Sequence, residues 1–343
     1  MRKFLCLICC VALMLTFCSC KEEKRESVET VAAILIEDAC DIVIKKPEVT
    51  PPPTPEQQPE IKDEPKPQPT SSTPPVATPP PTETKIPLEA FTYTVNDPEN
   101  TRGLSTVKKG FSFGIAQNGV AHNQSFVNQA TFDGFQNVQA LALDTKTQEK
   151  VMYLTFDNGY EYQNLTADIL DILKEKGVKA AFFITLSYAK NNKALVQRMI
   201  DEGHIVGNHS TTHPSFPSLT RTQMAEEIAT LDNYLRTNFS YTSPYFRFPS
   251  GEHSECALEL VTSLGYKSVF WSLAHTDWDT SAQKGADHAY STVTSRFHSG
   301  AVILLHAVST DNTQALGRII DTATSEGYTF KTLDDYFNNM DAQ

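Results

Sequence analysis

The chain has 343 residues, a formal net charge of −12 and a pI near 5.2. That length suffices for one large domain or two average ones. The acidic balance argues against nucleic acid as a partner, because nucleic acid requires basic patches and the sequence carries no basic cluster.

The first residues, 1–20, are typical of a secretory signal. A short basic start precedes an apolar run over residues 4–17, which is shorter than the roughly 20 residues of a membrane-spanning helix. Ser19-Cys20 followed by charged residues resembles a bacterial lipoprotein signal with Cys20 as the lipid attachment site, although Phe17 replaces the usual Leu. We therefore expect an extracytoplasmic, membrane-anchored protein. Ordinary cleavage and an uncleaved anchor are the alternatives.

Residues 21–90 are predicted to form a disordered, proline-rich linker. The stretch 47–87 is rich in Pro, Thr, Glu and Lys and has few large apolar side chains, so it cannot bury enough surface to offset chain entropy. Such a spacer could hold a domain away from a membrane, or it could be a tail without that purpose. Only Cys40 and Cys256 lie beyond the leader, so a disulfide framework is not indicated.

The folded domain is expected over residues 91–343. Residues 91–150 are rich in Asn, Gln and Gly with weak periodicity, which predicts an irregular lead-in that packs against the rest. From Val151 onward, helical stretches end in Gly and short apolar strands follow. Helices are predicted over 164–176, 193–202, 255–264, 288–298 and 313–326, and strands over 151–156, 180–184, 204–208, 244–248, 266–271, 301–305 and 328–330.

This repetition of strand, helix and Gly implies parallel βαβ units. The fold class is therefore α/β, either an incomplete (β/α) barrel or an open doubly wound sheet. In both architectures the active groups gather at the carboxyl ends of the strands. Polar and titratable residues recur at those ends, namely Asp157, Asn158, His209, His213, Arg247, Asp277, Trp278 and His306.

His209 and His213 are spaced so that both rings can face one side of a helix or a tight turn. Two imidazoles plus an oxygen ligand suit a divalent metal, with zinc favoured and manganese or cobalt as alternatives. A solvent-exposed histidine pair without a metal is the alternative reading of this spacing.

The same group of residues permits hydrolysis of an acyl bond. Asp157 is the candidate general base, and His306 is the candidate acid for the leaving amine. Asp277 could hydrogen-bond His306 and keep it protonated, and Arg247 could orient Asp157. A structural salt bridge is the alternative for Arg247, and core packing is the alternative for Trp278.

Five segments, in order, resemble the motifs of the polysaccharide deacetylases, carbohydrate esterase family 4. They are Thr155-Phe156-Asp157-Asn158-Gly159, His209-Ser210-Thr211-Thr212-His213, Arg247-Phe248-Pro249-Ser250-Gly251, Asp277-Trp278 and Leu304-Leu305-His306. The resemblance covers roughly residues 91–336. It implies an incomplete (β/α) barrel of the polysaccharide deacetylase type, metal-dependent removal of acetyl groups from a glycan, and substrate contacts by Tyr160, Ser250 and Trp278.

Two positions depart from the common family pattern. Asn158 stands where most members have a metal-binding Asp, and Ala274 stands where the fourth motif often begins with Asp. Both features resemble the branch of muramic δ-lactam de-N-acetylases of spore-forming bacteria. That branch implies deacetylation of N-acetylmuramic acid in the peptidoglycan glycan strand, followed by closure of the freed amine onto the lactyl carboxyl.

Two further hypotheses remain open. The enzyme could deacetylate another glycan, such as chitin oligosaccharides, the N-acetylglucosamine of peptidoglycan or acetylated xylan. Alternatively, the domain could be a non-catalytic wall-binding module, a view that Asn158 motivates because a neutral amide is a weaker metal ligand. We expect a monomer in either case.

Overall fold

The structure is a computed structural model and describes residues 86–341, without the side chains of residues 339–341. The predicted signal segment 1–20, its lipid attachment site Cys20 and most of the linker 21–90 lie outside the described residues. No helix among residues 86–341 is long and apolar enough to cross a membrane.

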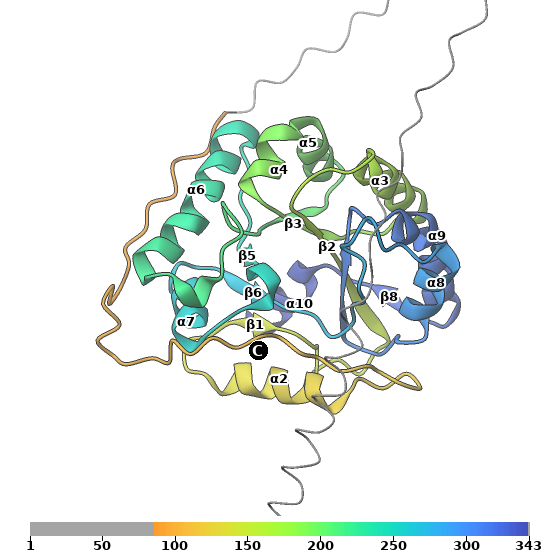
Figure 1. The fold of residues 1–343 in the computed structure, drawn as a ribbon, viewed down its shortest axis with the longest axis horizontal. Helices are drawn as coiled ribbons and strands as arrows, with labels where there is room; N and C mark the ends of the chain where they lie inside the picture. The colour runs from red at the N-terminus through yellow and green to blue at the C-terminus, as the bar shows by residue number, and fades with distance from the viewer. Residues whose placement is uncertain (1–85, 342–343) are drawn as a thin grey trace, which may run out of the picture. The chain divides into compact units, whose positions relative to one another are not determined.

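One sheet of eight strands organises this part of the chain (Figure 1). Along the sheet the order is β1-β6-β5-β4-β3-β2-β7, with β8 paired to β2, and every ladder is parallel. The strands are β1 (Ala140–Leu141), β2 (Val151–Asn158), β3 (Ala181–Ile184), β4 (Ile205–Asn208), β5 (Tyr245–Phe246), β6 (Lys267–Val269), β7 (Ala301–His306) and β8 (Thr329–Phe330).

The helices surround this sheet (Figure 1). They are α2 (Asn123–Gly134), α3 (Leu165–Lys176), α4 (Leu186–Asn191), α5 (Lys193–Asp201), α6 (Arg221–Phe239), α7 (Glu255–Ser263), α8 (Ala286–Thr294), α9 (Thr310–Ser325) and α10 (Leu333–Asp341), with short 3₁₀ turns at Phe216–Ser218 and Pro249–Gly251.

The two edges of the sheet approach each other without forming a continuous ladder among the described residues. Isolated bridges join Leu143 to Ala301 and Leu273 to Ile303. The predicted incomplete (β/α) barrel is therefore confirmed, and the open doubly wound alternative is set aside.

Alternate residues of the strands enter two apolar clusters, as the twofold period of a strand requires. In β2, Met152, Leu154 and Phe156 pack in the cluster that includes side chains of α3 and α9. Val151 and Tyr153 belong to the second cluster, on the other face of the strand. This alternation decides where the two polar residues at the end of β2 point.

Two predictions about the elements need correction. The lead-in is not irregular throughout, because residues 123–134 form α2, whose first turn is capped by the His122 side chain. The longest helix, α6, is absent from the predicted set. It begins with a capping box at Thr220 and Gln223 and ends at Ser240, which adopts the left-handed conformation that the sequence analysis sought only at Gly.

Candidate active site

The carboxylate of Asp157 is buried at the carboxyl end of β2, beside the end of β7. In the ladder Asp157 lies opposite His306, so the strand register alone brings the predicted base and the predicted acid together. Asp157 is 8% exposed and Arg247 is 0% exposed. Burying such charges is costly unless they are paired, so their contacts matter.

Arg247 lies directly after β5 and holds Asp157 in place. Its Nη1 donates to Oδ1 of Asp157 at 2.8 Å. Its Nε and Nη2 donate to the carbonyl oxygens of Val269 and Phe270, at 2.9 and 3.2 Å. The guanidinium also lies over the ring of Phe183, 4.2 Å from its centroid. The predicted Arg247–Asp157 contact is therefore present, and the guanidinium has no freedom to turn away.

These surroundings keep Asp157 ionised. Burial alone would raise the pKa of this carboxyl, but the charge of Arg247 above all, together with that of His306, outweighs it and holds the pKa below its usual value. An ionised carboxylate inside a largely apolar setting is a competent proton acceptor.

The surroundings of His306 shift its pKa in the opposite direction. Its Nδ1 lies 2.7 Å from Oδ1 of Asp277, and its backbone N–H donates to Oδ2 of the same carboxylate at 2.8 Å. Burial disfavours the imidazolium, but the hydrogen bond and charge of Asp277 outweigh burial and raise the pKa of His306. The predicted Asp277–His306 contact is confirmed, and it favours a protonated His306 beside an ionised Asp157.

A further residue fixes Asp277. Asn312, buried at the start of α9, donates from Nδ2 to Oδ2 of Asp277 at 2.5 Å. Its Oδ1 lies 2.9 Å from Nε2 of His275. The amide oxygen can only accept, so His275 carries the proton on Nε2 in this contact. The sequence analysis predicted neither Asn312 nor His275 as a site residue. Their spacing in the sequence gives no sign that they contact each other or Asp277.

His209 and His213 lie on a loop after β4 rather than on a helix, with their ring centroids 4.9 Å apart. Ser210 and His213 both adopt positive φ, at 70° and 59°, which makes the turn tight enough to bring the rings together. The two rings therefore lie close together as predicted, and a tight turn rather than a helix brings them there.

Glu227 of α6 pins this loop. Its Oε2 accepts hydrogen bonds from the backbone N–H groups of Thr211 and Thr212, at 2.9 and 2.8 Å, and its Oε1 accepts from Oγ1 of Thr212 at 2.7 Å. A glutamate that far along the chain offers no recognisable signal in the sequence, and only the fold brings it to the loop.

The tautomer of His209 follows from one contact. Its Nδ1 lies 2.8 Å from the carbonyl oxygen of Arg247, which can only accept, so Nδ1 carries the proton. Burial lowers the pKa of His209 to about 4. The imidazole is therefore neutral near pH 7, and its Nε2 lone pair faces Oδ2 of Asp157 at 3.6 Å. Such a nitrogen is suited to bind a cation.

Asn158 faces the other side of β2. It follows Asp157 directly, so its side chain leaves the opposite face of the strand, where Nδ2 donates to Oγ1 of Thr166 in α3 at 3.3 Å. Its Oδ1 is buried and has no hydrogen-bond partner among the described residues. An unsatisfied buried carbonyl oxygen is costly unless a ligand completes it.

The donor set fits a divalent cation with few anionic ligands. Within residues 86–341, no three His, Cys, Asp or Glu side chains cluster as metal ligands. A neutral imidazole at His209, the adjacent ring of His213 and the orphan oxygen of Asn158 can each donate a lone pair, and this set suits a borderline ion such as Zn²⁺. That Asn158 joins the two histidines stays a prediction, because the structure records no contact between them.

The predicted substrate residues are open to solvent. Trp278 is 55% and Tyr160 is 53% exposed, while Ser250 lies on an exposed turn with a φ of 55°. The Trp278 ring lies edge-on to His306, 5.7 Å between centroids. Simple core packing of Trp278 is therefore wrong. Its contact with a substrate stays a prediction, as do those of Tyr160 and Ser250.

The chain is similar to known proteins over the domain that carries these residues. Residues 144–269 match the family model described as polysaccharide deacetylase. The peptidoglycan-N-acetylmuramic acid deacetylase PdaA of Bacillus subtilis strain 168 is 43% identical over 190 residues, which span 55% of this chain and 72% of that protein. A chitooligosaccharide deacetylase of Bradyrhizobium sp. strain ANU 289 is 34% identical over 156 residues, 45% of this chain and 69% of that protein.

A solved structure gives the same result for the fold. The structure of Bacillus subtilis PdaA, described as a family 4 carbohydrate esterase, superposes with a TM-score of 0.62 at 37% identity, covering 69% of this chain and all of that one. The ordered motifs, the incomplete barrel and these similarities lead to one conclusion: the chain belongs to the polysaccharide deacetylase family.

Proposed function

We propose that the protein removes the N-acetyl group from N-acetylmuramic acid in peptidoglycan, after which the freed amine closes onto the lactyl carboxyl as a muramic δ-lactam. One observation carries the proposal: Asp157, held by Arg247, lies opposite His306, held by Asp277, at the carboxyl ends of two adjacent strands. The likeness to a relative named for N-acetylmuramic acid supports the choice of sugar.

The two charged pairs divide the proton transfers between them. Asp157 accepts the proton of the attacking water, because its lowered pKa leaves it ionised. His306 gives its proton to the departing amine, because its raised pKa favours the protonated form. Two titratable groups whose environments push their pKa values apart are the usual mark of a base and an acid working together.

Three residues are proposed as ligands of a divalent cation, namely His209, His213 and Asn158, with zinc favoured over manganese or cobalt. When bound, such an ion polarises a carbonyl group and lowers the pKa of water. Arg247 links this group to the base, because its carbonyl oxygen fixes the tautomer of His209 while its guanidinium holds Asp157. Tyr160, Ser250 and Trp278 are proposed to contact the sugar chain.

The proposed setting is the cell wall outside the cytoplasm, with Cys20 as a lipid anchor and residues 21–90 as the spacer. The signal-like leader supports this location. The Cys20→Ala variant should appear in the culture medium rather than in the membrane fraction. Retention of that variant in the membrane would remove the lipoprotein assignment and leave the catalytic proposal untouched.

Acetate release tests the reaction itself. Peptidoglycan from which part of the stem peptides has been removed should release acetate with the wild type, and the Asp157→Asn variant should lose about 100- to 10,000-fold in rate. The variant should still bind the glycan, because it keeps the exposed aromatic residues. If wild type and variant both bind and neither releases acetate, the domain is a wall-binding module instead.

A further inference from the structure

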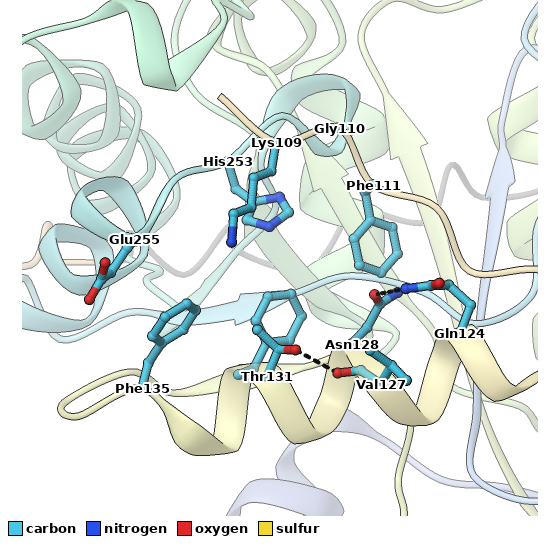
Figure 2. Close-up of a pocket in the computed structure, with 11 residues that line it drawn as sticks. Lys109, Gly110, Phe111, Gln124, Val127, Asn128, Thr131, Phe135, His253 and Glu255 are labelled. Carbon is cyan, nitrogen blue, oxygen red and sulfur yellow. Dashed lines mark hydrogen bonds between the residues drawn. The ribbon is translucent and has the colours of Figure 1, made fainter. Parts of the chain in front are cut away.

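A cleft lies on the side of the domain built by the lead-in. It has a volume of about 300 Å³, which is at the lower end of the range for ligand pockets, roughly 300–1,000 Å³. Figure 2 shows α2 below the cleft, with Lys109 and His253 above it. None of its lining residues belongs to the proposed catalytic or metal-binding group.

The upper wall is fixed by the backbone. Lys109 and His253 form an antiparallel bridge, in which the N–H of Lys109 donates to the carbonyl of His253 at 2.8 Å and the reverse bond measures 3.0 Å. His253 follows the third motif by two residues. The next residue but one in the lead-in, Phe111, packs against Gly251 so closely that a Cβ at Gly251 would lie 2.7 Å from that of Phe111. The cleft therefore adjoins the turn that carries Ser250, one of the predicted substrate residues.

Three titratable side chains in the cleft, those of Lys109, His253 and Glu255, keep hydrogen-bonding or charge-pairing capacity that the protein does not use. The ammonium of Lys109 has no carboxylate partner within residues 86–341 and lies 5.9 Å from the ring centroid of Phe135. His253 is 7% exposed, and its Nδ1 donates to the carbonyl of Gly251, so Nε2 keeps a lone pair without a protein partner in the described chain. One carboxylate oxygen of Glu255, Oε2, accepts a long hydrogen bond of 3.3 Å from the N–H of Ser105.

The neutral polar side chains of the cleft already use part of their hydrogen-bonding capacity within the protein. Gln124 donates to Asn128 at 2.9 Å, Asn128 donates to the carbonyl of Ser112 at 2.7 Å, and the Thr131 hydroxyl donates to the carbonyl of Val127 at 2.7 Å. These bonds use one donor of each amide and the hydroxyl hydrogen of Thr131, so fewer neutral donors are left for a sugar, which is recognised through many neutral hydrogen bonds. A ligand with separated charges would use the groups that are free.

We propose that this cleft binds a short acidic peptide that carries an ammonium group, free carboxylate groups and methyl side chains. Lys109 pairs with a carboxylate, His253 Nε2 accepts a backbone N–H, and Glu255 pairs with the ammonium. The rings of Phe111 and Phe135 cover methyl groups. Peptidoglycan carries short peptides of this chemistry, and identifying the ligand as such a stem peptide rests on the proposed function.

Calorimetric titration of the full-length protein with alanylglutamate tests the proposal. The wild type should bind this dipeptide at millimolar concentration or below, and Lys109→Met should weaken binding about tenfold or more, the loss expected for one charge-assisted contact. Val127→Glu, which puts a competing carboxylate on the exposed side of α2, should weaken it as well. Lys108→Met is the matched control, because Lys108 pairs with Glu252 and does not line the cleft.

The competing outcomes are distinct. If alanylglutamate fails to bind, or if Lys109→Met binds it as tightly as the wild type, the proposal is wrong. If N-acetylglucosamine binds and Lys109→Met leaves its affinity unchanged, the cleft is a sugar subsite instead. The Asp157→Asn variant should bind alanylglutamate as the wild type does, so a failure of the deacetylase proposal does not affect this result.

Discussion

His306 and Asp277 are joined twice, by Nδ1 to Oδ1 at 2.7 Å and by the backbone N–H of His306 to Oδ2 at 2.8 Å. The second contact comes from the strand itself, so the carboxylate cannot leave the imidazole while β7 stays paired. The pair therefore sets the protonation of His306 through a rigid connection.

Replacing that carboxylate should shift the pH dependence of activity. The raised pKa of His306 keeps the acid protonated, so activity falls as pH rises through that pKa, while the lowered pKa of Asp157 sets the loss of activity at low pH. In Asp277→Asn, burial would lower the pKa of His306. The alkaline limb of kcat/KM against pH should therefore move to lower pH, with a roughly hundredfold loss of kcat.

The low-pH limb of the same pH profile is the internal control for the Asp277→Asn variant. Asp157 keeps Arg247, so the low-pH limb should stay close to its wild-type position. An alkaline limb that does not move would mean that His306 is not the group that titrates there.

Asn312 is expected to act as a positioning residue for Asp277. Asn312→Ala removes a hydrogen bond to a buried carboxylate, a contact worth about 1.5–3 kcal/mol. We expect kcat to fall about tenfold or more while KM stays near the wild-type value, since Asn312 has no contact with the predicted substrate residues. Asn238→Ala is the control, because that side chain makes only exposed contacts away from the site, with the backbone carbonyl of Tyr234 and the ammonium of Lys193. Equal kcat in both variants would remove the positioning role.

Glu227 should contribute to metal affinity without being a ligand. Glu227→Ala releases the loop between His209 and His213, and support of this kind typically contributes 10- to 100-fold in metal affinity. Zinc binding, measured by competition with a chromophoric chelator, should weaken by about tenfold. Glu226→Ala, on the exposed side of the same helix, should bind zinc like the wild type. Unchanged affinity in Glu227→Ala would show that the loop holds its shape without this carboxylate.

A buried ion pair away from the site should contribute more to the free energy of unfolding than an exposed one. Arg221 donates to Glu259 at 2.7 Å, and the two side chains are only 2% and 9% exposed. Glu259→Gln leaves a buried guanidinium without a counter-charge and should lower the free energy of unfolding by about 3 kcal/mol. Asp321→Asn, at the exposed partner of Lys176, should leave it nearly unchanged. Denaturant titration of both variants measures the difference, and equal midpoints would contradict this account.

Much of the sheet could be predicted because the strands are short apolar runs that end in polar residues. The run that begins at Val151 predicted β2, and its end at Asp157 predicted the position of the base. Parallel strands place such ends at one edge, so Asp157, His209, Arg247 and His306 could be grouped without knowing the register.

Other features could not be predicted from local patterns. Helix α6 ends at Ser240 in the left-handed conformation, so a rule based on Gly misses it. The direction of Asn158 depends on the parity of β2, which sends its amide toward Thr166 rather than beside Asp157. Glu227 and Asn312 act through the tertiary fold, because each reaches a loop or carboxylate from a helix distant in sequence.

The most direct test of the central claim is mass spectrometry of muropeptides. Peptidoglycan lacking part of its stem peptides would be incubated with the purified full-length protein, with and without added zinc, and then digested. We predict that muramic acid loses one acetyl group and one molecule of water in a zinc-dependent manner, and that Asp157→Asn produces neither change. Loss of acetyl alone would contradict lactam formation. An unchanged muramic acid, with or without zinc, would contradict the proposed deacetylation.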